Sequence, residues 1–426
     1  MLEMHIDLYN SDGECNMDAY FTAFDKNGDG KLDLEEFKLI CRALFQNGNE
    51  KIYSLEDTKL REIFDVFDKN QDNFIDRDEF LFCWNHWIKI IVCPISAFLI
   101  VDVQNDFITG TLNIMNCAAQ QNGLDVIEPI NTLLDTVNFD AVFYSLDWHP
   151  SDHISFIDNL QQRVLDQTSP ISAETAKTYD TVIFAGTPPM KQRLWPRHCV
   201  QDTWGSELHH DLKIVDNGIK VYKGTNPEVD SYSAFWDNEK LTATTLCEQL
   251  RLKNATDIYV CGLAYDVCVG ATALDALATG YRTILVDDCS RGVDLFDIEK
   301  TKSTVIKNNG VVVNSNNVKA MVEGSDRRPE LGYKLAMENL DFSDFHPVDK
   351  KCSSFLIVKG AYPLRSEMFH HYLKPNLEAS LTVPRISLEH NLVSRTVYKR
   401  LDPSLELVIT ILYCLTVQDL PVCLSS

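Results

Sequence analysis

The chain has 426 residues, of which 45% are hydrophobic and 24% charged, a composition that is typical of folded domains and argues against a disordered chain. Its formal net charge of −23 at pH 7 argues against non-specific binding to nucleic acids and to anionic membranes. No secretory signal is predicted, and no apolar run reaches the roughly 20 residues that a membrane span requires. Thirteen cysteines without paired spacing predict mostly reduced thiols and a cytoplasmic protein, with the nucleus as an alternative.

Composition divides the chain into three zones. Residues 1–91 are helical in period and acidic, with about twice as many carboxylates as lysines and arginines. Residues 95–345 alternate apolar runs with amphipathic stretches. Residues 352–426 lose both the acidity and the alternation, and we leave this extension unassigned. Its apolar run at 405–417 is too short to cross a membrane.

The acidic zone contains two similar loop segments, which begin at Asp25 and at Asp68. Each places oxygen-bearing side chains at positions 1, 3, 5 and 9 and a glutamate at position 12, between amphipathic helical patterns, which is the spacing of a Ca²⁺-binding EF-hand loop. We therefore predict a pair of Ca²⁺ sites. The predicted ligands, with Lys31 and Phe74 acting through their backbone carbonyls, are Asp25, Asn27, Asp29, Lys31, Asp33 and Glu36 in the first loop and Asp68, Asn70, Asp72, Phe74, Asp76 and Glu79 in the second.

Two further positions in these loops carry structural expectations. The sharp turn of the first loop falls on Gly30, whereas the second loop has Asn73 there, which tolerates positive φ less freely than glycine. Leu32 and Ile75 occupy position 8, where two paired loops are expected to meet as short β-segments.

The middle zone is expected to alternate strands and helices. The predicted strands lie at 95–102, 141–146, 219–222, 257–261, 283–287 and 311–313, and the predicted helices at 126–137, 242–252, 269–279 and 298–308. This alternation predicts an α/β fold with a doubly wound, mostly parallel sheet, preceded by an all-α EF-hand pair. The polar, proline-containing stretch 158–191 is interpreted as an insertion between sheet elements.

Cys268 is the cysteine whose neighbours favour reactivity, because it follows an apolar run and a glycine-bearing bend and opens a helical pattern. A thiol in the first turn of a helix faces unpaired N–H groups and the positive end of the helix dipole, and both favour the thiolate. Asp102, at the end of a predicted strand, can accept the thiol proton, and Lys223 can hold both partners electrostatically. A helix cap is the alternative interpretation of Asp102, and a solvated lysine that of Lys223.

A second cluster combines a carboxylate with histidines. Asp147, His149 and His153 lie in one short segment, and His198 lies further along the chain. A single histidine is more often structural, but this set can converge on one divalent cation and suits Zn²⁺, Fe²⁺ or Mn²⁺. Cys199 is an alternative soft ligand, although we interpret it as a packing residue.

These segments resemble those of the nicotinamidases, within the isochorismatase-like cysteine hydrolases. The resemblance covers about residues 95–313, just over half of the chain. It rests on FLIVDVQNDF (98–107), SLDWHPSDHISF (145–156), LWPRHCV (194–200), KGTNPEVDSYSAF (223–235) and GLAYDVCV (262–269). Several motifs in the same order make a chance similarity improbable.

The resemblance implies a role for each matched residue. Cys268 would be the nucleophile, Asp102 the general base and Lys223 its charged partner. The implied metal ligands are Asp147, His149, His153 and His198, completed by water, and the implied pocket aromatics are Phe107, Trp195 and Tyr232. A cis peptide is implied between Leu263 and Ala264, with the N–H groups of Ala264 and Cys268 stabilising the oxyanion.

The implied activity is hydrolysis of nicotinamide to nicotinate and ammonia through a cysteine thioester, in NAD salvage. The expected partners are nicotinamide and Ca²⁺, the expected active-site metal is Zn²⁺ with Fe²⁺ or Mn²⁺ as alternatives, and a homo-oligomer is compatible with the sequence. Two other functions stay open: an amidohydrolase of the same superfamily acting on another small amide, and a Ca²⁺-sensing interaction protein with an inactive hydrolase domain. Regulation of turnover by Ca²⁺ is a hypothesis, beside a purely structural or docking role of the EF-hands.

Overall fold

The computed structural model describes residues 16–48 and 51–339. The unassigned extension, residues 352–426, lies outside the described residues, as do the last positions of the zone predicted at 95–345. Among the described helices, none combines the length and the apolar character that a bilayer span requires.

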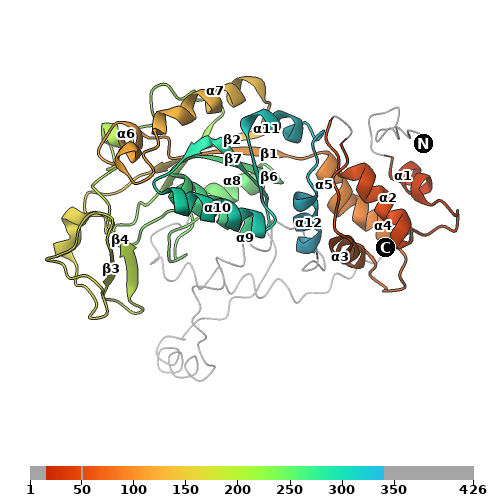
Figure 1. Ribbon diagram of the computed structural model, residues 1–426, viewed down its shortest axis with the longest axis horizontal. Helices are drawn as coiled ribbons and strands as arrows, with labels where there is room; N and C mark the ends of the chain where they lie inside the picture. Colours follow the sequence, from red (N-terminus) through yellow and green to blue (C-terminus); the bar gives the residue numbers. More distant parts are fainter. Residues whose placement is uncertain (1–15, 49–50, 340–426) are drawn as a thin grey trace, which may run out of the picture. The chain divides into compact units, whose positions relative to one another are not determined.

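A six-stranded sheet with the order β5-β2-β1-β6-β7-β8 forms the centre of the α/β region (Figure 1). Its strands are β1 (Ser96–Val101), β2 (Ala141–Asp147), β5 (Ile219–Lys223), β6 (Asp257–Leu263), β7 (Arg282–Arg291) and β8 (Val311–Val313). Every neighbouring pair is parallel. The six predicted strands and the parallel sheet are therefore confirmed.

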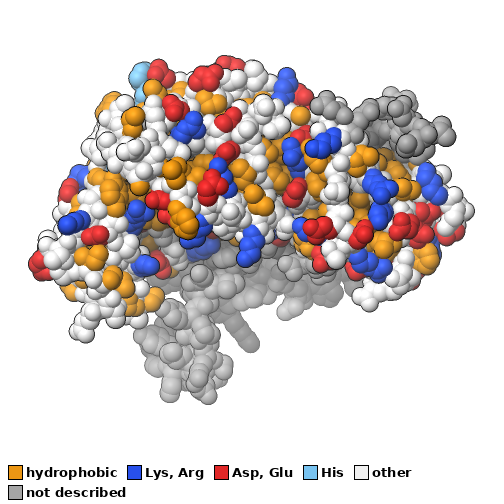
Figure 2. Space-filling view, viewed as in Figure 1, with side chains coloured by type: hydrophobic (Ala, Val, Ile, Leu, Met, Phe, Trp, Pro, Cys, Tyr) orange, Lys and Arg blue, Asp and Glu red, His pale blue; other side chains and the backbone are white. Residues whose placement is uncertain are grey.

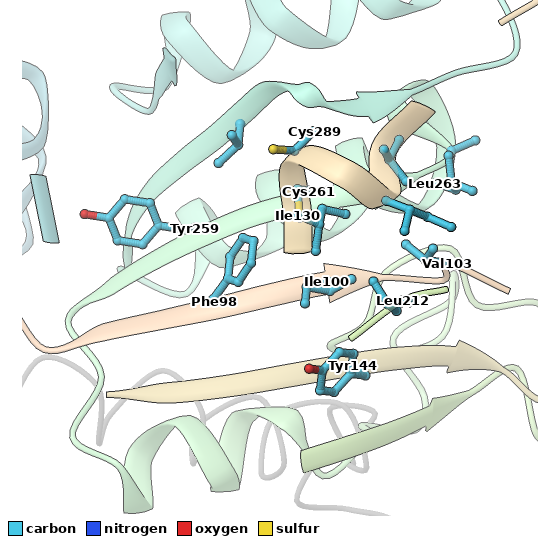
Figure 3. Close-up of a cluster of buried hydrophobic side chains, with 14 of the residues drawn as sticks. Phe98, Ile100, Val103, Ile130, Tyr144, Leu212, Tyr259, Cys261, Leu263 and Cys289 are labelled. Atoms are coloured by element: carbon cyan, nitrogen blue, oxygen red, sulfur yellow. The ribbon is translucent and has the colours of Figure 1, made fainter. Parts of the chain in front are cut away.

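Helices cover both faces of this sheet. One face carries α7 (Ile127–Thr136) and α11 (Ser315–Val322), and the other carries α8 (Leu246–Leu252), α9 (Gly270–Ala278) and α10 (Leu295–Lys307). Within β1, Phe98 and Ile100 face the first layer, where Figure 3 shows them near Ile130 of α7, and Leu99 faces the second. Because β1, β2 and β6 are buried on both faces, their sequences are mostly apolar rather than alternating.

The order of the strands locates the place where a ligand can bind. From the β1–β6 pair the chain proceeds outward through β2 and β5 on one side and through β7 and β8 on the other. Ligands of doubly wound sheets bind beyond the carboxyl ends of the strands, where the order reverses. Asp102 directly follows β1 and Cys268 lies in the helical turn Tyr265–Val269 after β6, so both residues flank this reversal.

The inserted stretch is more ordered than the sequence predicted. β3 (Thr181–Phe184) and β4 (Met190–Arg193) form an antiparallel hairpin. Val182 and Phe184 pack with Leu160 and Leu194 in a small separate core. The sequence analysis missed this hairpin because its apolar run is short and isolated between polar segments.

The N-terminal region forms the predicted EF-hand pair. Its helices are α1 (Met17–Phe24), α2 (Leu34–Leu44), α3 (Asp57–Phe67) and α4 (Arg77–Cys83), which continues through η1 (Trp84–Ile88) into α5 (Lys89–Val92). Leu32 and Ile75 exchange two backbone hydrogen bonds of 2.9 Å, as expected for position 8 of paired loops. Gly30 and Asn73 have φ angles of 83° and 66°, so the asparagine does adopt the left-handed turn.

One helix that the sequence did not predict connects the two regions. α12 (Pro329–Glu338) contributes Leu331 to the core beside the sheet and Leu335 and Ala336 to the core of the EF-hand pair. Its buried residues Leu331, Gly332, Leu335 and Ala336 lie on one side of the helix, and this side contacts both cores.

Charged side chains of both signs are interspersed on the face shown in Figure 2. Some form exposed pairs, such as Lys31 with Asp72 and Lys38 with Asp57 in the EF-hand region. Each exposed pair contributes little to stability, so the net charge of −23 bears on solubility and association rather than on the fold.

Candidate active site

The ends of three strands bring Asp102, Lys223 and Cys268 together. Lys223 Nζ, at the end of β5, lies 2.9 Å from Asp102 Oδ2 and 3.4 Å from Cys268 Sγ. All three side chains are buried. Because the side chains of Asp102 and Lys223 are buried and contact each other, the alternative interpretations of Asp102 as a helix cap and of Lys223 as a solvated lysine are wrong.

Asp102 is held in a conformation that is uncommon for a residue other than glycine, with a φ of 49°. Its Oδ1 accepts a hydrogen bond of 2.6 Å from the Ser145 hydroxyl. Burial raises the pKa of the Asp102 carboxyl, and the neighbouring Lys223 ammonium opposes that rise. A carboxylate whose affinity for a proton is raised in this way is suited to act as a general base.

The electrostatics of Cys268 differ from the expectation. Burial raises the pKa of its thiol well above the usual value, Lys223 opposes this effect, and Asp102 adds to it. Lys223 is shared, because its Nζ also donates to Asp147 Oδ1 and to the carbonyl of Ser231. A thiolate would thus be a third anion beside a single ammonium. Burial thus opposes the stabilisation of the thiolate expected from the helix start, and proton transfer to Asp102 stays the predicted route to the nucleophile.

A second cluster forms beside this one. Asp147 ends β2, and its carboxylate lies near the Nε2 atoms of His149 and His198, at 3.5 and 3.8 Å from Oδ2. The Nδ1 of His149 is 2.9 Å from the carbonyl of Gly224, and that of His198 is 2.7 Å from the carbonyl of Pro196. Since a carbonyl can only accept, each Nδ1 carries a proton, and each Nε2 is the ring nitrogen directed toward Asp147.

This cluster fits a divalent cation. The ligand atoms of Asp147, His149 and His198 all lie within 4.8 Å of one another. The buried Nε2 of His149 has no hydrogen-bond partner among the described residues. Burial lowers the pKa of His198 to about 4, which keeps this imidazole neutral near pH 7 and able to coordinate. The pKa of His149 is raised by the neighbouring Asp147 carboxylate, against the effect of burial. A carboxylate with two imidazoles is a donor set that Zn²⁺ and related ions accept.

His153 stands apart from these three residues. Its ring stacks on His149 at a centroid distance of 4.0 Å, because the turn closed by the hydrogen bond from His153 N to Pro150 O folds the ring back. Its potential ligand atom groups with those of His149 and Asp230 rather than with the Asp147 cluster. Three of the four predicted ligands therefore converge, and the fourth lies beside them.

A small cavity opens next to Cys268. Phe107, Trp195 and Tyr232, the three predicted aromatics, line it, and the Trp195 indole N–H donates to the Tyr232 hydroxyl at 3.3 Å. Additional walls come from Leu112, Ile114, Val267 and Val293, and polar groups from Asp147, His198 and Asp230. A mostly apolar cavity with a few polar groups at one side suits a small aromatic ligand with polar substituents.

The backbone beside the nucleophile also matches the expectation. The peptide bond between Leu263 and Ala264 is cis. Ala264 and Cys268 both line the cavity.

The sequence analysis did not single out two residues of this site. Asp230 lines the cavity, accepts a hydrogen bond of 2.8 Å from Gln192, and has its pKa raised by burial. Gln104 fixes the backbone of Asp147, donating to its carbonyl at 2.8 Å and accepting from its N–H at 2.9 Å. Both lie inside the segments that carry the family resemblance, so membership in those segments was the available signal.

The two EF-hand loops have matching internal hydrogen bonds. Asp25 Oδ2 accepts from the N–H of Gly30, and Asp68 Oδ2 accepts from the N–H of Asn73, both at 2.9 Å. Glu36 closes a capping box with Asp33 at the start of α2. Asp76 and Glu79 form the same capping box at the start of α4. The loops therefore present equivalent oxygen atoms at equivalent positions.

Known proteins match both regions. An isochorismatase-domain profile matches residues 96–317, and a profile of the EF-hand domain pair matches residues 16–83. The nicotinamidase of Escherichia coli is 37% identical over 204 residues, which cover 47% of this chain and 85% of that protein. The nicotinamidase of Saccharomyces cerevisiae is 32% identical over 205 residues, which cover 46% of this chain and 88% of that protein.

Among solved structures, a nicotinamidase/pyrazinamidase of Acinetobacter baumanii aligns with 53% of this chain and 98% of its own, at 33% identity and a TM-score of 0.45. The chain belongs to the isochorismatase family and carries an EF-hand pair ahead of its isochorismatase domain.

Proposed function

We propose that the protein is a nicotinamidase, an amidohydrolase that converts nicotinamide to nicotinate and ammonia in NAD salvage. The observation that carries this proposal is the buried contact of Cys268, Lys223 and Asp102 at one wall of an aromatic cavity. The nicotinamidases of Escherichia coli and Saccharomyces cerevisiae, at 37% and 32% identity, support the choice of substrate.

The first step is a proton transfer coupled to nucleophilic attack. Asp102 takes the proton of the Cys268 thiol as the sulfur attacks the amide carbon. Lys223, 2.9 Å from the carboxylate and 3.4 Å from the sulfur, stays beside the negative charge as it moves from one atom to the other. The charge around this ammonium is therefore unchanged by the proton transfer, which lowers the cost of forming a thiolate in a buried site.

The remaining steps use the same groups. The N–H groups of Ala264 and Cys268 stabilise the tetrahedral oxyanion, and ammonia leaves with the proton that Asp102 returns. A water molecule then loses a proton to Asp102 and attacks the thioester, which releases nicotinate and restores the thiol. One carboxylate thus serves as base and as acid in turn.

We assign Asp147, His149 and His198 as ligands of a divalent cation, Zn²⁺ by donor type with Fe²⁺ or Mn²⁺ as alternatives, and place His153 beside them. When bound, such an ion supplies a Lewis acid for the pyridine nitrogen of the substrate. Phe107, Trp195 and Tyr232 bind the ring itself. Binding of the ring in this pocket directs the carboxamide carbon toward Cys268, so the pocket contributes to catalysis by positioning the substrate.

We further assign a Ca²⁺ ion to each EF-hand loop, with the ligands given by the loop spacing. The boundary between the EF-hand and hydrolase domains is placed between residues 91 and 95. A location in the cytoplasm, with the nucleus as an alternative, agrees with a role in NAD salvage.

The proposal is tested by measuring ammonia release from nicotinamide with purified, metal-loaded protein. We expect release by the wild type and by Cys93→Ala, which removes an exposed thiol, and none above background by Cys268→Ala. Other pyridine amides serve as competing substrates. No release by well-folded, metal-loaded wild-type protein would contradict the proposal, and hydrolysis of a different amide alone would favour the other amidohydrolase function.

A further inference from the structure

The apolar surface of the EF-hand pair is covered by a helix of the same chain. Phe37, Phe45 and Trp87 of the EF-hand region form one buried cluster with Leu335 and Ala336 of α12. The cluster is densely aromatic, with Phe37 stacked on Trp87 at 5.9 Å and Phe45 edge-on to it at 5.8 Å. α12 therefore takes the place at which an EF-hand pair binds an amphipathic target helix.

The helix backbone approaches this cluster closely at Gly332. The Trp87 indole N–H donates a buried hydrogen bond of 2.8 Å to the Gly332 carbonyl. A Cβ atom at position 332 would lie 2.3 Å from Cε1 of Phe45, nearer than two carbon atoms can approach. The absence of a side chain at Gly332 is thus a condition of the contact.

Polar contacts surround the apolar one. Arg327, just before α12, donates to the carbonyls of Ala43 and Leu44 at the end of α2, where a cation is favoured by the helix dipole. Tyr333 donates from its hydroxyl to the Glu62 carboxylate of α3. These hydrogen bonds fix the position of α12 along the EF-hand helices, in addition to the contacts of its buried apolar side chains.

The first turn of α12 also packs into the hydrolase domain. Leu331 lies in the core beside the sheet, one helical turn from Leu335 in the EF-hand core. Arg282 of β7 adds a second link, since it pairs with Asp257 of β6 and donates to the carbonyl of Ile90 at 3.0 Å. The EF-hand pair is thus attached to the sheet that carries the catalytic residues.

The loops and the bound helix share one core. Leu32 and Ile75, which join the two loops at position 8, belong to the same buried cluster as Leu335. Any ligand that orders the loops also orders the walls of the groove that holds α12. In sensor EF-hands, Ca²⁺ favours the open helix pair that grips a target helix.

We propose that α12 is the intrinsic target helix of the EF-hand pair, so that Ca²⁺ binding to the loops and docking of α12 strengthen each other. Coupling of this kind is reciprocal: the docked helix raises the affinity for Ca²⁺ by the factor by which Ca²⁺ favours docking. The surface that a free sensor offers to a separate protein is here used by the chain itself. This inference concerns Ca²⁺ and α12 alone and does not depend on the substrate of the hydrolase.

The test is calorimetric titration of the full chain with Ca²⁺, in the wild type and in variants of α12. Gly332→Val forces a clash with Phe45, and Leu335→Ala removes a buried contact without a clash. Lys334→Ala, whose ammonium pairs with Glu338 on the same helix, is the matched control. We expect Ca²⁺ affinity to fall roughly ten-fold in Gly332→Val and a few-fold in Leu335→Ala, within the range of measured coupling between sites, and to be unchanged in Lys334→Ala.

Circular dichroism of each variant shows whether it is folded. If Gly332→Val does not fold, Leu335→Ala decides the question. Wild-type affinity in folded Gly332→Val or in folded Leu335→Ala would overturn the coupling, and a higher affinity in either would show that docking opposes Ca²⁺. A loss of amidase activity with intact coupling, or the reverse, keeps this inference separate from the proposed nicotinamidase function.

Discussion

The catalytic cluster and the EF-hand loops are both rich in carboxylates, but they are built in opposite ways. Asp102, Lys223 and Cys268 come from three strands or strand ends far apart in the sequence and meet in a buried site. The loop residues from Asp25 to Glu36 are consecutive, and half of them are exposed. In the first region a buried ammonium balances the acids. In the second, Asp29 is exposed, Asp25 and Asp33 are partly exposed and Glu36 is buried, and a bound cation can neutralise them. Removing a charge should therefore stop chemistry in one region and weaken ion binding in the other.

The largest effect is expected from Asp102→Asn. The amide keeps the shape of the side chain but cannot take the thiol proton, and loss of a general base lowers rates by about 10²- to 10⁴-fold. The decrease should appear in kcat of nicotinamide hydrolysis, measured beside Asp125→Asn, which alters an exposed carboxylate. Near-normal kcat in Asp102→Asn would mean that another group removes the proton.

The two histidines that stack on each other should differ sharply. His149→Ala removes an imidazole whose Nε2 lies beside Asp147, so the variant should lose most of its bound transition metal and its activity. His153→Ala should keep the metal, with at most roughly a 10-fold loss of affinity, as for a residue outside the first coordination shell. Elemental analysis after dialysis against a chelator measures the metal content of each variant and so distinguishes a ligand from a neighbouring residue. Equal metal loss in both variants would make His153 a ligand, as the family resemblance implied.

The EF-hand loops are expected to respond independently of the catalytic metal. Glu36→Gln weakens the ligand at position 12 of the first loop, so one of two Ca²⁺-binding events should weaken by about ten-fold or more. The content of transition metal should stay at the wild-type level. If Glu36→Gln leaves both Ca²⁺-binding events unchanged, the first loop is not a Ca²⁺ site.

The smallest effect is expected from Ser145→Ala. This change removes the 2.6 Å hydrogen bond to Asp102 Oδ1 without touching the carboxylate or Lys223. A hydrogen bond to a charged group contributes about 1.5 kcal/mol at the lower end of its range, so kcat should fall by roughly ten-fold. A loss as large as that of Asp102→Asn would indicate that Ser145 itself takes part in the proton transfer.

The difference between the two regions also explains what the sequence could predict. Ligand spacing in the EF-hand loops is local, so the pairing of Leu32 with Ile75 follows from counting positions. The strand that precedes Asp102 was predictable because a buried parallel strand is a continuous apolar run, whereas the strand that ends at Lys223 is an edge strand with alternating burial. Their contact with Cys268 required the order of the strands, which only the family resemblance supplied.

What could not be predicted depends on partners that are distant in sequence. The raised pKa of the Cys268 thiol follows from its burial, with Lys223 opposing the rise, and these surroundings are visible only when β1, β2 and β5 are side by side. The stacking of the His153 ring on His149 depends on the folded loop. α12 contacts two cores whose other residues lie far away in the sequence.

The most direct test of the proposed function is to trap the covalent intermediate. Protein mixed with nicotinamide is quenched in acid within the first turnover, digested and analysed by mass spectrometry. We expect a nicotinoyl group on the peptide that contains Cys268, and no such group in Cys268→Ala or in unreacted protein. Ammonia release with the group on another residue, or a burst of ammonia in the first turnover with no acylated peptide, would contradict a thioester at Cys268.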